Sequence, residues 1–354
     1  MIDYKKEIED LVSIVEKEGA SDLHLSVGRH PTIRVSSDLL PIVRKPVYSP
    51  EDTMGILMEI LNEDNKKIFL AKKDLDFSYS PDSKIRFRGN AFYQRGVVGI
   101  ALRLIPENIK TIEELNLPKK LYEFANKKQG FFLCVGPVGQ GKSTTLASLV
   151  QHINLERAEH IITIEDPVEY SFKSERSIID QREVSFDTDD FASALKSMFR
   201  EDVNVALIGE MRNYETISSA VTASETGHLV FSTLHTNSAS QTIDRIIDSF
   251  PPNQQKQIRI QLAASLLGVF SQRLIPRVSG GLIPAYELLI NNNAVANLIR
   301  EGRTAEIDVV IETSSEDGMI SLNQSLTELV RAGEVNTEVA YHYSIDPHGL
   351  DRLI

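Results

Sequence analysis

Two stretches in the first hundred residues carry apolar side chains at helical spacing. In residues 1–19 the apolar positions recur near one face of a helix, with charged residues between them. The same period returns over residues 50–71, and Ser49-Pro50-Glu51-Asp52 in front of it is a good helix start. The pattern therefore predicts one helix over each stretch.

Between and after these helices the apolar positions alternate with a period of two, which is typical of strands. Residues 20–42 predict a hairpin with turns at Gly28-Arg29 and Ser37-Asp38, and residues 74–104 predict a meander of strands. Helices and antiparallel strands together predict a small α+β domain over residues 1–105.

Beyond this domain the hydrophobic pattern changes to short, continuous apolar runs, which are typical of strands buried on both faces of a parallel sheet. Each run ends in polar or glycine residues. Because ligands bind beyond the carboxyl ends of parallel strands, we expect these residues to converge at one edge. The runs are Phe131–Val135 before Gly136, Ile161–Ile164 before Glu165-Asp166-Pro167, Val205–Ile208 before Gly209-Glu210, and Leu229–Leu234 between His228 and His235.

The rest of the chain reads as a linker and further helices. Two prolines bracket residues 106–118, which we interpret as the linker between domains. The sheet domain is expected over residues 119–290, with a long helix over 254–275, and AYELLI at 285–290 fits either a strand or a helix start. Residues 291–354 predict a C-terminal region of short helices.

One glycine-rich loop carries a specific chemical signature. Gly136-x-x-x-x-Gly141-Lys142-Ser143 follows a predicted strand and precedes a predicted helix, which is the context of a phosphate-binding P-loop. Glycines let backbone N–H groups approach phosphate oxygens, and a helix N-terminus favours negative charge there. The alternative is a flexible turn that binds nothing. We expect ATP to contact Gly136, Pro137, Val138, Gly139, Gln140, Gly141, Lys142, Ser143 and Thr144.

Acidic residues after two of the strands are candidates for catalysis. Lys142 is expected on the β- and γ-phosphates, and the Ser143 hydroxyl on Mg²⁺. Glu210 follows a run similar to a Walker B strand, although Gly209 stands where an aspartate usually lies. Glu165 and Glu210 are expected to divide two roles, activation of water and retention of Mg²⁺ through its hydration shell. The sequence leaves open which carboxylate has which role, and a capping or structural role for either one stays an alternative.

Two histidines flank one strand of the predicted sheet. His228 precedes it and His235 follows it, so both are candidates for sensing the γ-phosphate, and ordinary core or surface histidines are the alternative. Their spacing matches no closed zinc site. Arg200 and Arg212 lie near strands of the same sheet and are expected to support the acidic residues or to sense nucleotide.

The strand meander of the first domain carries several arginines. Arg86 and Arg88 fall on one face of a strand, and Arg95 and Arg103 lie further along. A solvated polar face explains them, and contact with the phosphates of a neighbouring subunit is the sharper alternative.

Composition narrows the class of protein. The formal net charge of −12 argues against broad nucleic-acid binding, which needs clustered cations. The single cysteine, Cys134, excludes an intramolecular disulfide and a cysteine cluster for zinc, and it is expected in the core. The amino-terminal stretch does not resemble a signal peptide, and no apolar run reaches the ~20 residues that span a bilayer. We expect a cytoplasmic protein without a transmembrane segment.

Four segments together resemble one family closely. GPVGQGKSTT, ITIEDPVEY, REDVNVALIGEMRNYETI and ETGHLVFSTLHTNSA are similar to the Walker A, Asp box, Walker B and His box of secretion ATPases. The resemblance runs from SDLHLSVGRHPTIRV to the C-terminus. It implies a homohexameric ring, an α/β chain with an N-terminal PAS-like α+β domain, a RecA-like P-loop motor domain and a C-terminal helical region.

Within this superfamily the chain resembles the type IV pilus retraction ATPases, through NLIREGRTAEIDVVIETSSEDGMISLNQSLTELVRAGEV. That branch implies ATP hydrolysis with Mg²⁺, an inner-membrane pilus platform protein as partner, and a place at the inner face of the cytoplasmic membrane. It also implies that Arg88 and Arg103 act as arginine fingers in trans. Some positions depart from the pattern: Ala296 replaces an arginine, Asn213 an aspartate, and Val138 and Gln140 the common Thr and Ser.

Two other functions stay open at this point. One is a motor for pilus assembly or type II secretion, against which the missing four-cysteine zinc motif counts. The other is a nucleotide-binding accessory paralogue with little turnover, against which Lys142, Ser143, Glu165 and Glu210 count.

Overall fold

The computed structural model describes residues 2–35, 38–82, 85–106 and 108–354. The chain divides into two compact units. The first comprises residues 1–107 with 169–171, and the second comprises residues 108–168 with 172–354. Among the described residues, no helix is both long and apolar enough to cross a membrane.

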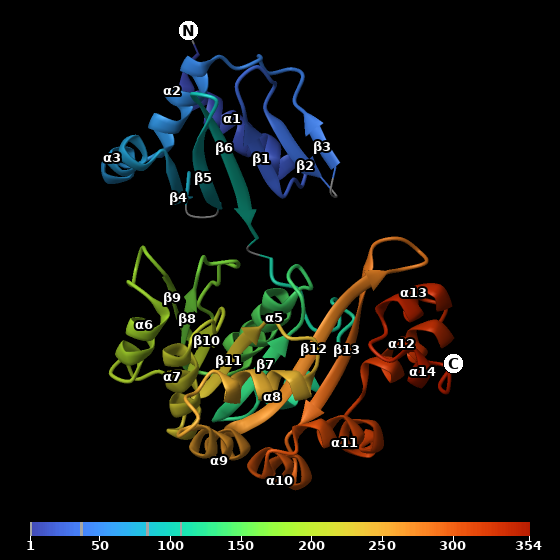
Figure 1. Ribbon diagram of the computed structural model, residues 1–354. Helices are drawn as coiled ribbons and strands as arrows, with labels where there is room; N and C mark the ends of the chain where they lie inside the picture. The colour runs from blue at the N-terminus through green and yellow to red at the C-terminus, as the bar shows by residue number, and fades with distance from the viewer. Residues whose placement is uncertain (1, 36–37, 83–84, 107) are drawn as a thin grey trace. The chain divides into compact units, whose positions relative to one another are not determined.

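The first unit is a six-stranded antiparallel sheet with three helices (Figure 1). The strands run in the order β3-β2-β1-β6-β5-β4. Their bounds are β1 (Asp22–Leu25), β2 (Thr32–Val35), β3 (Asp38–Pro41), β4 (Asp74–Tyr79), β5 (Arg86–Gln94) and β6 (Val97–Ile105). The helices are α1 (Tyr4–Lys17), α2 (Pro50–Ile60) and α3 (Glu63–Lys72). The unit is therefore the expected mixture of helices and antiparallel strands.

The helix expected over residues 50–71 is in fact two helices. Ser49 caps α2 in a capping box with Asp52, as its sequence predicts, but the helix ends at Ile60. The Asn62 side chain then accepts the Asn65 N–H and starts α3. A second capping residue inside the apolar pattern therefore divides the segment.

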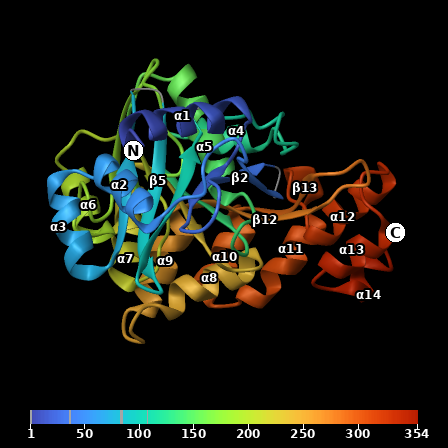
Figure 2. The ribbon, with the colours of Figure 1, turned by 90° about the horizontal axis from the view of Figure 1, so that it is seen from above.

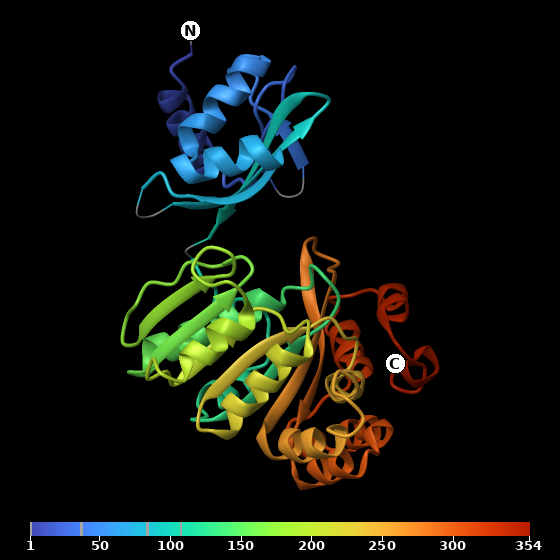
Figure 3. The same cartoon turned by 60° about the vertical axis from the view of Figure 1, so that its left-hand side comes forward.

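The strands of residues 20–42 form as predicted, with a turn at Gly28-Arg29. The second expected turn includes Ser37, which lies outside the described residues. The helices cover one face of the sheet (Figure 3). Leu23, Phe87 and Leu102 of the strands belong to the same buried core as Leu11 and Val15 of α1. The other face is polar, because strand residues alternate between the two faces.

The second unit is built on a seven-stranded sheet in the order β13-β12-β7-β11-β10-β8-β9. All its neighbouring strands are parallel except β13, which is antiparallel to β12. The bounds are β7 (Gly130–Val135), β8 (His160–Glu165), β9 (Ile178–Glu183), β10 (Val205–Ile208), β11 (Leu229–Leu234), β12 (Leu266–Pro276) and β13 (Leu282–Ile290). The four apolar runs of the sequence are β7, β8, β10 and β11.

Helices cover both faces of this sheet. On one face α4 (Leu121–Ala125) and α5 (Lys142–Glu156) pack on Phe132 and Phe231. On the other face lie α6 (Phe191–Met198), α7 (Tyr214–Glu225), α8 (Ala239–Asp248), α9 (Gln255–Ser265) and α10 (Asn293–Glu301). Burial on both faces explains why these strands read as continuous apolar runs.

The C-terminal segment forms short helices, as expected. They are α11 (Ile307–Thr313), α12 (Leu322–Arg331), α13 (Thr337–Tyr343) and α14 (Pro347–Leu350), with 3-10 turns at Thr304–Glu306 and Ser315–Asp317. Figures 1 and 2 show α12, α13 and α14 beside the β12–β13 hairpin, on the side of the sheet away from α6. Ile275, Ile283 and Leu326 form a separate small core there.

The long helix expected over residues 254–275 is wrong. The helix α9 ends at Ser265 and the chain continues as strand β12. The segment Leu266–Phe270 is buried between β7 and β13, so its unbroken apolar run has the same cause as in the other central strands. Gly268 marks the close approach, since a Cβ there would lie 2.6 Å from the carbonyl oxygen of Leu289. Residues 285–290, left open between strand and helix, belong to β13.

Cys134 lies in β7 and is fully buried, as its sequence position predicts. Burial raises the pKa of its thiol to about 12, against a smaller lowering effect of the Lys142 charge. The thiol is therefore a packing group in the centre of the sheet.

Candidate functional site

The parallel strands bring most of the predicted polar residues to one edge of the sheet. In the register, Val135 pairs with Leu234, and Ile208 pairs with both Ser232 and Ile164. The residues that follow these strands, among them Gly136, Glu210 and His235, therefore emerge at the same carboxyl edge. The Thr233 hydroxyl donates to the Gly209 carbonyl at 2.6 Å and holds the turn that carries Glu210.

The loop between β7 and α5 needs its glycines. Gly136 has φ +144°, and a Cβ on it would lie 2.3 Å from the carbonyl oxygen of Gln272. Gly141 has φ +77° and immediately precedes Lys142, the first residue of α5. A side chain at either position would be strained. Because glycine has no side chain, the backbone of the loop can lie close to β12. The N-terminus of α5 opens onto this loop, which is the arrangement that binds phosphate groups.

Lys142 is folded back onto its own loop. Its ammonium donates to the carbonyl oxygens of Gly136 and Pro137, each at 2.8 Å, and lies 3.2 Å from Nδ1 of His235. Because an ammonium can only donate, Nδ1 accepts and the ring proton lies on Nε2. That nitrogen lies 3.3 Å from Oε1 of Glu210. Lys142, His235 and Glu210 therefore form one connected chain.

Arg212 extends this chain at its other end. Its guanidinium lies 2.8 Å from Oε2 of Glu210 and 3.7 Å from Oδ2 of Asp166. The hydrogen bond and the charge of Glu210 raise the pKa of Arg212 further. Asn213, which replaces the aspartate of the resembling pattern, caps α7 by accepting the Thr216 N–H at 3.0 Å. Either Asn or Asp performs that role.

Glu165 ends β8 at the same edge but is buried, with 6% of its surface exposed. It accepts the Thr163 hydroxyl at 2.7 Å and the Gln181 amide at 3.4 Å. Glu165 and Glu210 thus differ in environment, because Glu210 is shared between His235 and Arg212 at the surface of the edge.

His228 lies at the opposite edge of the sheet, and the expectation that both histidines converge on the P-loop is wrong for this residue. It precedes β11, whose first residue, Leu229, pairs with Gly130 at the beginning of β7. A six-residue strand is about 20 Å long, which separates His228 from the P-loop of its own chain. Its Nδ1 lies 3.0 Å from the Ala223 carbonyl and its ring packs edge-on against Phe199. These contacts close the end of α7.

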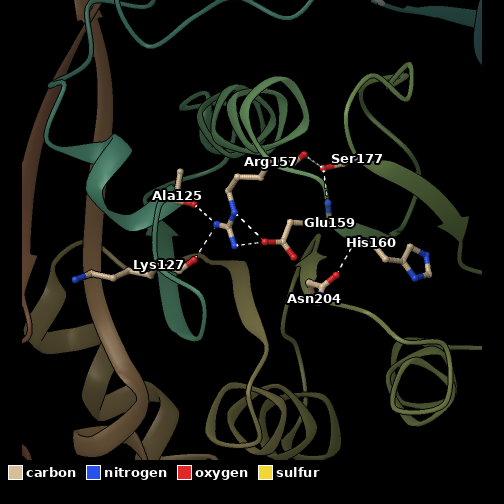
Figure 4. Close-up of polar contacts among 7 residues, drawn as sticks. All are labelled: Ala125, Lys127, Arg157, Glu159, His160, Ser177 and Asn204. Carbon is tan, nitrogen blue, oxygen red and sulfur yellow. Dashed lines mark hydrogen bonds and ion pairs between the residues drawn. The ribbon is translucent and has the colours of Figure 1, made fainter.

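The amino edge also holds a dense cluster of polar contacts, drawn in Figure 4. Arg157, just after α5, donates to the carbonyls of Ala125 at 2.6 Å and Lys127 at 2.8 Å, and it pairs with Glu159 at 2.8 Å. Ser177 donates to the Arg157 carbonyl and accepts the Glu159 N–H. We call Arg157 and these contacts the Arg157 clamp, which joins α4, α5, β8 and the segment before β9.

The buried Glu287 of β13 supports the loop after His235. Its carboxylate accepts the N–H of Ala239, the first residue of α8, at 2.7 Å. Burial raises the pKa of Glu287 to about 7, a rise that the Ala239 bond and Arg273 oppose and that Asp308 and Glu312 reinforce.

Arg88 and Arg103 lie side by side on the polar face of the first unit. They pair directly in the register of β5 and β6, and Arg103 donates to Asp22 at 2.9 Å. Burial would raise the pKa of Asp22, but the hydrogen bonds from Ser21 and Arg103 outweigh burial and lower it. Arg86 donates to Ser78 at 2.9 Å. Within the described residues, the Arg88 side chain makes no hydrogen bond or ion pair.

Gln272 is a site residue that the sequence reading missed. Its amide donates to the Gln140 carbonyl of the P-loop at 2.8 Å, and its oxygen accepts the Thr145 hydroxyl at 2.6 Å. The sequence predicts a helix over this segment, which would not place Gln272 beside the loop. A strand following the apolar run 266–270 was the signal available in the sequence.

Comparison with known proteins adds to this geometry. A family model described as "Type II/IV secretion system protein" matches residues 4–342. The chain is 42% identical over 334 residues to "Type IV pilus retractation ATPase PilT" of Pseudomonas aeruginosa, covering 94% of this chain and 97% of the relative. It is 38% identical over 349 residues to "Type IV pilus ATPase PilU" of the same organism, covering 98% and 91%.

A solved structure is similar over nearly the whole chain. It is described as the pilus retraction motor PilT with bound ADP. It matches with a TM-score of 0.91 and 44% sequence identity, covering 97% of this chain and 98% of that chain. The fold described above is therefore that of a nucleotide-binding relative.

Proposed function

We propose, because the chain belongs to the type II/IV secretion system protein family, that it is an ATP-hydrolysing motor that retracts type IV pili. In this proposal the second unit is a RecA-like motor domain and the first a PAS-like domain. Residues 106–118 link them, residues 119–290 form the motor, and residues 291–354 form its helical extension. Two relatives named for pilus retraction match this chain over nearly their full length, which supports retraction over assembly.

The observation that carries the proposal is the chain Lys142–His235–Glu210 at the P-loop. The Lys142 ammonium donates to two loop carbonyls and to a histidine nitrogen, all of which are neutral partners. The phosphates of ATP are a stronger partner for an ammonium, so nucleotide would draw Lys142 away from His235. His235 would then lose its contact with Lys142 and keep its contact with Glu210 beside the γ-phosphate. Nucleotide binding would in this way change the surroundings of the catalytic carboxylate.

The residues at this edge fit Mg²⁺ bound together with ATP. Among the described residues, no group of three or more His, Cys, Asp or Glu side chains forms a metal cage. Mg²⁺ usually binds through substrate phosphates, waters and one or two carboxylates, so the Ser143 hydroxyl with Glu210 or Glu165 is an adequate donor set. The ion would neutralise charge on the phosphates. Glu210, at the surface of the edge, is the better placed base for water, and the buried Glu165 the better placed support for the ion's waters.

We propose that the chain acts as a homohexamer in which Arg88 and Arg103 serve the neighbour's nucleotide. Their side-by-side register and the exposure of the Arg103 side chain, 68%, leave two cations on one open face. An arginine finger is worth roughly 10³–10⁵ in rate, because it offsets charge on the transferred phosphoryl group. The ring would work at the inner face of the cytoplasmic membrane, on the platform protein of the pilus, without contact to nucleic acid.

Mixed rings test the trans arrangement. Lys142→Ala and Arg88→Ala rings should each be inactive alone. Mixing the two variants creates interfaces that pair an intact P-loop with an intact arginine, so part of the phosphate release should return. If Arg88→Ala and Arg103→Ala rings are as active as wild type, both arginines belong to a solvated face and do not serve catalysis.

A second function is supported by the 38% identity to PilU, a type IV pilus ATPase. An accessory paralogue would bind ATP with little turnover, so steady-state phosphate release by the purified ring separates it from a motor. Deletion of the gene then tests direction: hyperpiliated, non-motile cells indicate retraction, whereas cells without pili indicate assembly.

A further inference from the structure

The strand β12 extends past its neighbour β7 at the carboxyl edge. β7 ends at Val135, which pairs with Ser271, while β12 continues to Pro276. Beyond Ser271 the P-loop takes the place of a neighbouring strand. The Gln272 carbonyl lies against Gly136, and the Leu274 N–H donates to the side-chain oxygen of Gln140 at 2.7 Å.

The contacts between loop and strand are reciprocal. The Gln140 side chain reaches the backbone of β12, and the Gln272 side chain of β12 reaches the backbone of Gln140 at 2.8 Å. Gln272 is 3% exposed, and both ends of its amide are bonded, the other to the Thr145 hydroxyl of α5 at 2.6 Å. A Cβ on Gly141 would lie 3.0 Å from its nitrogen, so the loop fits closely around it.

The length of both side chains matters for this arrangement. A serine at position 140 ends two atoms earlier than glutamine and would not reach the Leu274 N–H. That N–H faces away from β13 and would lose its protein acceptor. Gln140 stands where serine is common in the P-loops that this chain resembles. The longer side chain has a partner in this structure, the Leu274 N–H of β12.

We propose that Gln140 and Gln272 are positioning residues for the nucleotide, acting as a latch that fixes the P-loop on β12 before ATP binds. A loop with glycines at 136, 139 and 141 loses much conformational freedom when it closes around phosphate. The latch removes part of that freedom in advance, which strengthens binding through preorganisation. The inference rests on the proposed ATPase function.

The mechanism predicts which kinetic constant changes. The P-loop holds the same phosphates in the ground state and in the transition state, so a looser loop weakens both equally. Variants without the latch should therefore raise KM and the Kd for ADP while kcat changes little. A residue that only supports the fold would instead lower thermal stability with and without ADP alike.

Methionine tests the latch at constant side-chain length, because it has no comparable acceptor or donor. Gln140→Met should weaken ADP binding about two- to tenfold, as expected for one hydrogen bond, with kcat within twofold of wild type. Gln272→Met removes two bonds and should weaken ADP binding further. In both variants the ADP-induced rise in Tm should shrink. The matched control is Gln261→Met on α9, where the amide donates to the Glu225 carboxylate at the surface, at 2.6 Å.

The double variant supplies a second test. Both side chains act on one loop, so the loss in Gln140→Met with Gln272→Met should be smaller than the product of the single losses. If Gln272→Met folds poorly, the half-buried Gln140→Met alone decides. Wild-type values for Kd, KM and the ADP increment in Gln140→Met would overturn the latch, as would an equal loss in Gln261→Met. Absence of phosphate release from the wild-type ring would instead overturn the proposed ATPase function.

Discussion

The two edges of the seven-stranded sheet use the same residue types in opposite ways. At the carboxyl edge Lys142, His235, Glu210 and Arg212 are linked in a chain whose bonds are shared between competing partners. At the amino edge Arg157 is bonded to two fixed backbone carbonyls and one glutamate (Figure 4). A side chain at the carboxyl edge can exchange a protein partner for a phosphate. The Arg157 guanidinium at the amino edge has fixed partners and cannot.

Strand direction, more than residue identity, separates these two edges. His228 and His235 are seven positions apart and bracket a single strand, yet one closes a helix and the other contacts the P-loop lysine. A parallel sheet gathers loop residues with function at its carboxyl edge. The same sheet leaves its amino edge to structural contacts, so variants at the two edges should separate activity from stability.

The largest expected effect is the loss of Lys142. Lys142→Ala removes the cation proposed to bind the β- and γ-phosphates, and turnover should fall at least ~100-fold, as for other single electrostatic groups. Phosphate release by the purified protein measures it. Lys127→Ala at the amino edge is the matched control, because its backbone carbonyl still accepts from Arg157. Near wild-type turnover in Lys142→Ala would contradict the P-loop assignment.

The carboxylates come next. Glu210→Gln keeps the shape of the side chain but cannot accept a proton, so nucleotide binding should persist while hydrolysis falls about 10²-fold or more. Glu165→Gln should do likewise with a changed Mg²⁺ dependence. Nucleotide titration and phosphate release check the two parts separately. Normal hydrolysis in both variants would make these carboxylates structural.

The two histidines compare the edges most directly. His235→Gln removes the link between Lys142 and Glu210, and kcat should fall about 10- to 100-fold. His228→Gln lies at the other edge and should leave kcat and KM unchanged. Steady-state kinetics on the two variants in parallel is the measurement. Equal losses would mean that the amino edge also serves the reaction.

Removal of the Arg157 clamp should act on stability instead. Arg157→Ala leaves the carbonyls of Ala125 and Lys127 and the Glu159 carboxylate without their donor, at a cost of about 2 kcal/mol in the free energy of unfolding. Denaturant unfolding measures the loss, and kcat below the melting range should be retained. A variant with wild-type stability but reduced kcat would reverse the assignment of the two edges.

The last expected effect concerns the pH dependence of stability. In the folded protein the pKa of Glu287 is raised from 4.5 to about 7. The stability that this difference adds is therefore fully present below pH 4.5, and it is lost as the pH rises toward 7. Over that window it should lower the unfolding free energy by at most ~1.4 kcal/mol per pH unit. Glu287→Gln retains an acceptor for the Ala239 N–H and should flatten the curve. An unchanged pH dependence in the variant would show that another group carries it.

Much of the fold follows from local pattern. The apolar runs of β7, β8, β10 and β11 and the capping box of α2 have sequence signals that the structure bears out. The sequence pattern gives a wrong prediction where a helix passes directly into a strand without a glycine or proline between them. Ser265 ends α9 and Leu266 begins β12 directly, and no glycine or proline separates them. Long-range pairing with β7 and β13 decides that boundary, and a local window does not contain it.

The candidate site shows the same limit. Residues after the strands could be placed by the direction of a parallel sheet, and the P-loop by its spacing. The same rule places His228, which precedes β11, at the opposite edge, so the expectation for this residue was wrong because it treated both ends of the strand alike. Gln272 lies 132 positions from Gln140, and only the register of β12 with β7 brings the two together.

The buried thiol of Cys134 gives this protein a built-in probe of opening. Thiol reagents attack the thiolate, and with the pKa raised to about 12 and the side chain enclosed, labelling requires the centre of the sheet to open. Since Cys134 is the single cysteine, one modification event reports one opening event. The labelling rate thus measures how often the strand that leads into the P-loop separates from its neighbours, and nucleotide should slow it in proportion to its occupancy.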